Sequence, residues 1–442
     1  MPKIFPFRGL TFDGKKVPSL TQAVTQPYDR IDDALRAEYE KRSPHNIVRI
    51  DYGKTEASDG PSNNRYTRAA ALLKQWREAG VFAEDGTPAL YVYHQIYKVG
   101  KESRTRKGVI AALQLEEFGK GSIRPHEQTH DGPKADRLKL MTALGTVFDH
   151  VFMLYTDPKK QVNALLDPHA KGAPTLEARD DAGEIHRVWR VSDPAVLQSV
   201  QQAMAGKDAF IADGHHRYET ALNFREAMRK AGKKAEGTET PDNRLVTFVN
   251  MEDEGLTIFA THRLVYDVPK FAPAALTKAL ETHFDLHRYE LPGSQEELLE
   301  DLRFEGMDRP AIGIAFRDRS EALLAVLRDP AVMDKLITDK KSSAWKQLDV
   351  NVLHTAILEK HLGIGPAQLA AEKNVDFLRH ADAAIAKVRA PGSKYAAAFL
   401  INPITVPQIQ SIVKQGERFP QKTTDFYPKL ITGLVGCRYR FV

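Results

Sequence analysis

The stretch FIADGHHRYETAL, residues 210–222, has the pattern of a buried strand that turns sharply into a helix. FIAD is apolar up to its terminal acid, and Gly214 permits the backbone conformation that a tight turn requires. The spacing predicts a helix that runs to Lys230, with Tyr218, Leu222 and Met228 facing the core. A strand that leads directly into a helix is the repeating unit of α/β folds.

The start of this helix is a predicted phosphate site. The first turn of a helix presents backbone N–H groups and the positive end of the helix dipole to an anion. His215, His216 and Arg217 add side-chain donors there, and arginine can bind two phosphate oxygens at once. Cationic side chains oppose the dipole at this end, so helix stability alone does not explain them. Asp213 has two interpretations, as the N-cap of its own helix or as a ligand of Mg²⁺ between phosphates.

The remaining segments predict an α/β fold (mixed α+β). Helices are expected over residues 65–80, 134–145 and from Pro194 to Met204. Alternation predicts strands at LYVYHQIYKV and KGVIAALQLEEF. A strand is also expected at NIVRIDYG, residues 46–53. We predict three parts: an N-terminal α/β segment (1–87), a central domain (88–268) and a C-terminal α/β domain (269–442).

Composition excludes several classes of protein. A chain of 442 residues exceeds a single core, and 42% hydrophobic with 27% charged residues is typical of globular proteins. No apolar run approaches the roughly 20 residues that span a bilayer, and MPKIFPFRGL lacks the core of a secretory signal. The single cysteine, Cys437, suits a reducing cytoplasm, so we expect a cytoplasmic protein without a membrane partner. A net charge of +5 falls short of a nucleic-acid binder.

A second stretch, RPHEQTHDGPK (residues 124–134), contains His-Glu-x-x-His, the pattern of many zinc peptidases. Zinc binding by His126 and His130 needs a helix that extends well beyond the motif. Pro125 precedes the motif and Asp131-Gly132-Pro133 follows it, which predicts a helix of only one or two turns. A zinc peptidase is therefore the least favoured interpretation, behind a polar loop or a carboxylate with another role.

The pair PHEQ and ADGHHR resembles the free-serine kinases of the ParB–sulfiredoxin superfamily, over roughly residues 90 to 265. The whole chain is similar to the family called domain of unknown function 1015. The matching stretches are TQPYDRI, SPHNIVRI, RPHEQTH, KADRL, ADGHHRYETAL, GLTIFATHRL and FPQKTTDFYPKL.

The kinase resemblance implies a ParB/sulfiredoxin-like, nucleotide-binding central domain and transfer of phosphate from ADP or ATP to the hydroxyl of free L-serine. It implies that Glu127 is the catalytic carboxylate and that Asp213, also a catalytic candidate, opens the phosphate motif. It assigns phosphate binding to the residues that follow, Gly214, His215, His216 and Arg217. The chain between the two motifs is much longer than in the small kinases, so the resemblance does not identify the acceptor.

We therefore predict a phosphotransferase that uses ADP or ATP with Mg²⁺ and a small hydroxylated substrate. The alternative is a ParB-like protein that binds or hydrolyses a nucleotide as a switch. Further candidates for contacts with phosphate or a substrate carboxylate lie near Glu127 and in the C-terminal stretch QKTTDFYPK. We expect this stretch either to fold back over the site as a lid or to pack as a C-terminal arm. The candidates are His126, Lys134, Arg137, Lys422 and Thr423.

Overall fold

The computed structural model describes residues 2–125 and 131–442. These residues form two compact units. The first unit holds residues 2–125, 131–257 and 428–442, and the second holds residues 258–427. The predicted boundary between residues 87 and 88 falls inside the first unit, and the one between residues 268 and 269 falls inside the second.

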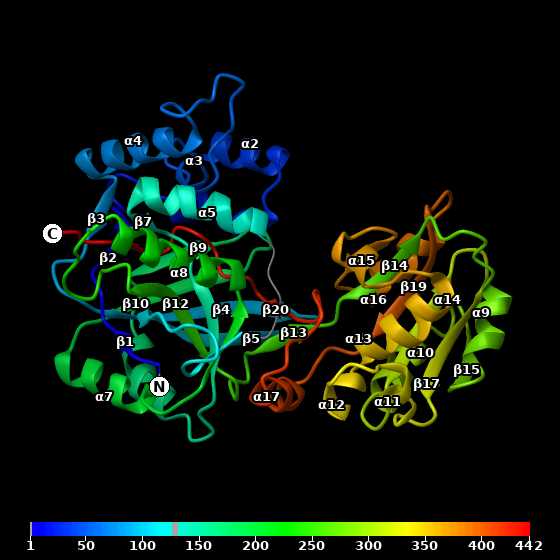
Figure 1. Cartoon of the computed structure of the whole chain (residues 1–442). Helices are drawn as coiled ribbons and strands as arrows, with labels where there is room; N and C mark the ends of the chain where they lie inside the picture. The colour runs from blue at the N-terminus through cyan, green and yellow to red at the C-terminus, as the bar shows by residue number, and fades with distance from the viewer. Residues whose placement is uncertain (1, 126–130) are drawn as a thin grey trace. The chain divides into compact units, whose positions relative to one another are not determined.

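The first unit is built on a large mixed sheet (Figure 1). Its strand order is β6-β11-β8-β12-β5-β4-β10-β9, and β1 also pairs with β5. Strands β8 and β12 are parallel neighbours and are buried along their whole length, because both faces of the sheet are covered. The strands are β1 (Ile4–Phe5), β4 (Leu90–Val99), β5 (Glu102–Gln114), β6 (Ile123–Arg124), β8 (Val151–Tyr155), β9 (Leu176–Arg179), β10 (Ile185–Val191), β11 (Ala209–Asp213) and β12 (Asn243–Asn250).

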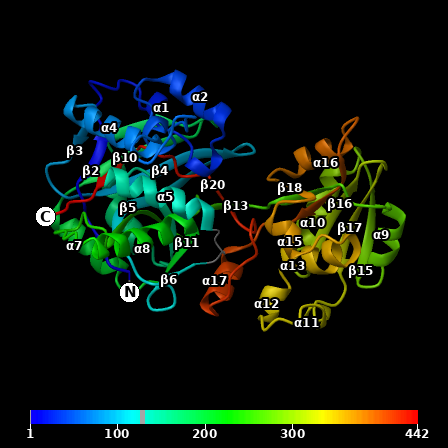
Figure 2. The same cartoon turned by 45° about the horizontal axis from the view of Figure 1, so that its top comes forward.

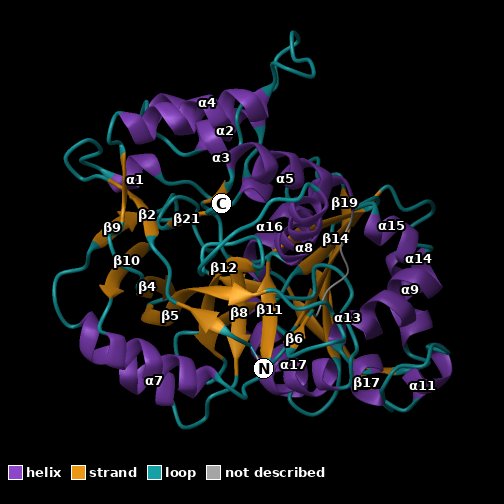
Figure 3. Cartoon of the chain, turned by 60° about the vertical axis from the view of Figure 1, so that its left-hand side comes forward, coloured by secondary structure: helices purple, strands orange, loops and turns teal. Residues whose placement is uncertain are grey.

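Helices cover both faces of this sheet. Helices α5 and α8 lie on one side of it and α7 lies on the other (Figures 1 and 3). The helices of the first unit are α1 (Leu20–Ala23), η1 (Tyr28–Arg30), α2 (Asp33–Arg42), α3 (Val48–Asp51), α4 (Arg65–Glu78), α5 (Asp131–Leu144), α6 (Gln161–Leu166), η2 (Asp167–Ala170), α7 (Pro194–Met204) and α8 (His215–Lys230).

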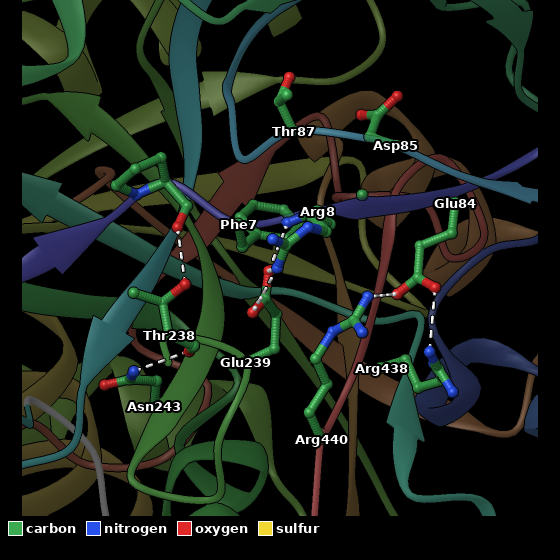
Figure 4. Close-up of polar contacts among 12 residues, drawn as sticks. Phe7, Arg8, Glu84, Asp85, Thr87, Thr238, Glu239, Asn243, Arg438 and Arg440 are labelled. Atoms are coloured by element: carbon green, nitrogen blue, oxygen red, sulfur yellow. Dashed lines mark hydrogen bonds and ion pairs between the residues drawn. The ribbon is translucent and has the colours of Figure 1, made fainter. Parts of the chain in front are cut away.

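A small antiparallel sheet joins the two ends of the chain to the first unit. Its order is β3 (Phe82–Glu84), β2 (Gly9–Phe12), β21 (Gly436–Arg438) and β7 (Thr146–Val147). Ion pairs link the C-terminal segment to β3, since Glu84 accepts hydrogen bonds from Arg438 and Arg440 (Figure 4). Nearby, the buried carboxylate of Glu239 accepts from the backbone and side chain of Arg8 (Figure 4).

The second unit contains an antiparallel sheet whose order is β15-β17-β16-β19-β14-β18. Helices α10 and α16 pack on one face of it through a core that includes Leu298, Leu302 and Ile385 (Figure 2). The strands are β14 (His262–Tyr266), β15 (Phe284–Glu290), β16 (Ala311–Phe316), β17 (Glu321–Leu327), β18 (Val375–Leu378) and β19 (Tyr395–Ile401). Separately, β13 (Thr257–Phe259) pairs with β20 (Asp425–Tyr427).

The helices of the second unit are mostly short, and one of them is a π-helix. Residues Leu353–Glu359 (η3) adopt a π-helix, which α13 precedes and α14 follows. The others are α9 (Pro273–Leu280), α10 (Gln295–Glu305), α11 (Val332–Leu336), α12 (Ser343–Lys346), α13 (Asp349–Val352), α14 (Lys360–Leu362), α15 (Pro366–Ala370), α16 (Ala381–Arg389) and α17 (Val406–Lys414).

The predicted mixed α/β class is confirmed, and two local predictions were wrong. The stretch NIVRIDYG was expected to be a strand, but Val48–Asp51 form helix α3. The trio Asp131-Gly132-Pro133 was expected to stop a helix, but all three residues are part of α5. Proline is tolerated in the first helical turn, where its missing N–H has no partner to lose. No helix in the described part of the chain is long and apolar enough to cross a membrane.

Candidate functional site

The junction between β11 and α8 forms a sharp turn, which we call the α8 turn (residues 213–217). Gly214 has φ 91° and ψ 32°, a left-handed conformation that favours glycine. A Cβ on this residue would lie 2.8 Å from Arg217 Nε, so the site requires glycine for space as well. The N-cap supplies no side-chain hydrogen bond, and no acidic residue lies in the first turn of the helix. The start of α8 is thus shaped as an anion site would be.

Arg217 is buried beneath this turn instead of extending into solvent. Its Nη2 lies 3.1 Å from Asp213 Oδ2, and its Nη1 donates to the carbonyl oxygen of His150. Burial alone would lower the pKa of Arg217, but the negative charges of Asp213 and Asp149 outweigh this effect and raise the pKa above its ordinary value. The guanidinium therefore stays charged. The contacts of Arg217 with Asp213 and His150 therefore hold the backbone of the α8 turn in place.

Asp213 is an ionised carboxylate among cations. Its Oδ2 lies 4.0 Å from Lys429 Nζ, and its side chain is 25% exposed. Burial would raise the pKa of Asp213, but Lys429, Arg217, His215 and Arg30 together hold it well below its ordinary value. This carboxylate does not cap its own helix, because the N-cap is Gly214.

The imidazole of His150 is a fixed, neutral support for the turn. Its Nε2 lies 2.8 Å from the carbonyl oxygen of Val435 and therefore donates, so Nδ1 accepts from the hydroxyl of Thr247 at 2.8 Å. Burial lowers the pKa of His150 to about 4. Because both ring nitrogens are engaged, the carbonyl that receives Arg217 has a fixed position.

A buried network of charges lies behind the turn. Arg137 donates to the backbone and carboxylate of Asp51 and to Asp136, and its guanidinium stacks on the Tyr28 ring at 4.3 Å. Burial raises the pKa of Asp51 to about 6, even though Arg137 lowers it. Arg137 and Asp51 line a small cavity together with Arg217 and apolar residues of α5.

Asp149 completes this network. Burial would raise the pKa of Asp149, but Arg244 and Arg217 hold it below its ordinary value, and Arg244 also donates to its carboxylate. The positive charge under the α8 turn is therefore held in place by carboxylates that lie deeper in the fold.

Residues 4–351 match the family model described as "Protein of unknown function (DUF1015)". The chain belongs to the DUF1015 family. The prediction made from the motif stretches is thereby confirmed. A search of curated proteins found no match to this DUF1015 chain.

Several solved structures match the DUF1015 chain at low identity. A mutant of free serine kinase in complex with AMP matches at 12% identity, covering 72% of this chain and 89% of its own, with a TM-score of 0.34. A conserved hypothetical protein from Pyrococcus furiosus matches at 14% identity, covering 73% and 91%, with a TM-score of 0.30. C-terminally truncated SbnI from Staphylococcus aureus matches at 12% identity, covering 70% and 82%, with a TM-score of 0.30.

The stretches that suggested the DUF1015 family supply the residues around the α8 turn. TQPYDRI supplies Tyr28 and Arg30, KADRL supplies Arg137, and the end of FPQKTTDFYPKL supplies Lys429. Sequence reasoning missed Arg30 and Lys429, although both lie within stretches already singled out. Each is distant from Asp213 in sequence, so nothing local indicated the contact.

The other predicted site residues have varied outcomes. Glu127, His126 and His130 are outside the described residues. Lys134 forms an ion pair with Glu219 at 2.8 Å, between α5 and α8. The lysine and threonine proposed for a C-terminal lid belong to the second unit: Lys422 lies 3.3 Å from Glu372, and the buried hydroxyl of Thr423 donates to the carbonyl of Pro420.

Metal-binding side chains do not form clusters of three among the described residues. Within residues 2–125 and 131–442, no group of three or more histidine, cysteine, aspartate or glutamate side chains could hold a metal ion. Asp213 also has Arg217 and Lys429 as neighbours, and these two cations oppose any further positive charge at the carboxylate.

Proposed function

We propose that the α8 turn binds the phosphates of ADP or ATP and that the protein transfers a phosphoryl group to the hydroxyl of a small metabolite such as free L-serine. The observation that carries this proposal is the left-handed glycine at a helix start that lacks acidic residues and has cations gathered around it. Backbone dipoles and fixed positive charges of this kind stabilise polyphosphate.

In this proposal, the N–H groups of the first turn and the side chains of His215 and His216 bind phosphate oxygens. Arg217 holds the turn through Asp213 and adds its charge from below. Phosphoryl transfer depends mainly on such positioning and neutralisation of charge.

The proposed base is Glu127, by its resemblance to the kinase motif. The substrate hydroxyl attacks the terminal phosphorus, the bond to the leaving phosphate of the nucleotide breaks, and the hydroxyl proton passes to the Glu127 carboxylate.

Mg²⁺ would enter as part of the nucleotide complex, with its charge balanced by the phosphates. Asp213 is its proposed protein ligand, because carboxylates are preferred ligands of this ion. The neighbouring cations argue against a resident ion before nucleotide binds.

The test is incubation of the protein with ADP, ATP or CTP, Mg²⁺ and a pool of hydroxylated metabolites that includes L-serine. We expect mass spectrometry to find a new phosphate ester that requires both protein and nucleotide. Release of phosphate from the nucleotide without any ester would overturn the kinase proposal and favour the nucleotide-dependent switch.

Glu127→Gln tests the proposed base. The amide keeps the shape of the side chain but cannot accept the proton, so turnover should fall by about 10²- to 10⁴-fold while nucleotide affinity is retained. The control is Glu102→Gln, on the exposed end of β5, which should leave both quantities unchanged. Equal turnover in the two variants would remove Glu127 from the mechanism.

A further inference from the structure

The residues Pro428 and Lys429 are held in place by two buried side chains of the β4–β5 hairpin. Gln95 Nε2 donates to the carbonyl oxygen of Lys429 at 2.9 Å, and Arg106 donates to the carbonyl oxygen of Pro428. Arg106 Nε in turn donates to Gln95 Oε1 at 3.0 Å. Both side chains are almost completely buried, Gln95 at 2% and Arg106 at 1% exposure. The backbone on either side of the 428–429 peptide bond is thus fixed from within the sheet.

Arg106 is connected to the α8 turn through Phe152 of the neighbouring sheet strand β8. Phe152 on β8 is the register partner of Asp213 on β11. The guanidinium of Arg106 stacks on the ring of Phe152 at 4.5 Å. Burial lowers the pKa of Arg106 to about 10, far above neutrality, so this side chain is a buried cation. Its positive charge contributes to the potential at Asp213.

The result is a lysine directed at the α8 turn. Lys429 Nζ lies 4.0 Å from Asp213 Oδ2, and its side chain is 15% exposed. An ammonium at that distance from a carboxylate is in reach of an anion bound at the same turn. Burial of a lysine costs free energy unless its ammonium is paired with an anion. An apolar residue at position 429 would avoid this cost, so stability alone does not explain the lysine.

We propose that Lys429 binds the nucleotide phosphates at the α8 turn, and that Gln95 and Arg106 are positioning residues that hold it there. This rests on the proposed function. It assigns part of the phosphate site to residues that follow the second unit in sequence, since residues 258–427 separate Lys429 from the rest of the first unit. An ammonium between Asp213 and a phosphate would reduce the repulsion between these two anions.

The first test compares Lys429→Met with Lys429→Arg by equilibrium titration of ADP with Mg²⁺. The methionine variant should bind about 10- to 100-fold more weakly, the loss expected for one charged hydrogen bond. Arginine keeps the charge and should recover most of the affinity. The affinity of the methionine variant should also depend less on salt concentration, because one screened attraction is gone.

Lys207→Met is the matched control. Lys207 lies just before β11, at the opposite end of this strand from Asp213, and pairs with Asp157 at 3.0 Å with the same 15% side-chain exposure. It should bind ADP as the wild type does. If Lys429→Met also binds like the wild type, the assignment of Lys429 is wrong. If the wild type itself binds no nucleotide, the proposed function fails instead.

The second test is a double-mutant cycle with Gln95→Leu, which removes the donor to the Lys429 carbonyl. The single variant should weaken ADP binding, and the same change in the Lys429→Met background should weaken it no further. An equal loss in both backgrounds would mean that Gln95 acts only on the fold. Thermal unfolding of each variant identifies any that fails to fold, and the comparison of methionine with arginine at position 429 stands without this cycle.

Discussion

Helices α7 and α8 each follow a strand of the same sheet, but they begin in different ways. At α7, the Asp193 side chain accepts a hydrogen bond from the backbone N–H of Ala195 at 2.8 Å, and Pro194 occupies the first turn. At α8, the N-cap is Gly214, which has no side chain, and the preceding acid pairs with Arg217 and lies close to Lys429.

The difference separates a helix start that serves stability from one that, in our proposal, binds a ligand. At α7 the acid is exposed, it caps its own helix, and its partner lies two residues away. At α8 the acid pairs with Arg217 of the same helix and lies close to Lys429 from a distant part of the chain, and the first turn carries cations against the helix dipole. Functional sites are where such local rules are broken, because distant contacts offset the local cost.

The largest effect is expected for Gly214→Ala. The new residue would have to adopt φ 91° with its Cβ 2.8 Å from Arg217 Nε. A left-handed non-glycine residue costs about 1–2 kcal/mol, and displacement of the buried Arg217 from Asp213 adds to it. We expect the free energy of unfolding to fall by about 3 kcal/mol or more and ADP affinity to fall at least about 100-fold. Urea denaturation and ADP titration measure the two quantities.

Gly232→Ala is the control at the other end of the same helix. Gly232 has φ 66°, and no atom lies within 4 Å of an added Cβ. The change should cost about 1 kcal/mol from the backbone alone and leave ADP binding as it was. If the two alanine variants bound ADP equally well, the α8 turn would not be the phosphate site.

A smaller effect is expected for Asp213→Asn. The change keeps the size of the side chain and removes the charge that Arg217 and Lys429 face. Loss of one charged hydrogen bond should lower the free energy of unfolding by about 1–3 kcal/mol. ADP binding with Mg²⁺ should weaken about tenfold if this carboxylate is a ligand of the ion. Tighter binding in the asparagine variant would instead mean that the carboxylate only repels phosphate.

The same variant has a signature in its pH dependence. Because the pKa of Asp213 is lowered on folding, its contribution to stability is complete above the ordinary pKa of 3.8 and is lost as the pH falls toward the lower folded value. The gap in unfolding free energy between wild type and Asp213→Asn should therefore be constant from about pH 7 to 5 and close below about pH 4. Denaturation curves across this range measure the gap. A gap that stays open below about pH 4 would place the effect in packing rather than charge.

Sequence pattern was sufficient where local chemistry determines the structure. The helix from Pro194 to Met204 was predicted with its bounds, because Asp193 and Pro194 are the signals of a helix start. Strands β4 and β5 were indicated by alternation and β-branched or aromatic residues. Tyr218 is in the core as predicted, whereas Leu222 and Met228 are only partly buried.

Sequence pattern failed where distant contacts decide. NIVRIDYG has the composition of a strand, but the buried Asn46 side chain accepts from the N–H of Val48 and donates to the carbonyl oxygens of Gln22 and Val24. The bonds to Gln22 and Val24 tie the start of the segment to residues more than twenty positions away, and Ile47, Val48 and Ile50 of the helical turn that follows are completely buried. Burial from all sides removes the amphipathic period that would have indicated a helix.

The candidate site shows the same division. The glycine turn and its cations could be predicted, since they are consecutive in sequence. The burial of Arg217 under the turn and the contact with Lys429 could not, because both depend on how β8 and the C-terminal segment pack around β11. Arg217, which the sequence pattern assigned to the ligand, thus contacts Asp213 and the backbone of His150 in the folded protein.

The smallest effect is expected for Asp193→Ala, which tests the other half of the comparison. Loss of an N-cap hydrogen bond at an exposed helix start costs about 1 kcal/mol. Its carboxylate has no role at the α8 turn, so ADP affinity and turnover should equal those of the wild type, and urea denaturation alone should detect the change. Asp193→Asn should recover most of the stability, because asparagine caps helices nearly as well as aspartate. If Asp193→Ala weakened ADP binding as much as Asp213→Asn does, both variants would be acting through general stability, and the contrast between the two helix starts would have no functional meaning.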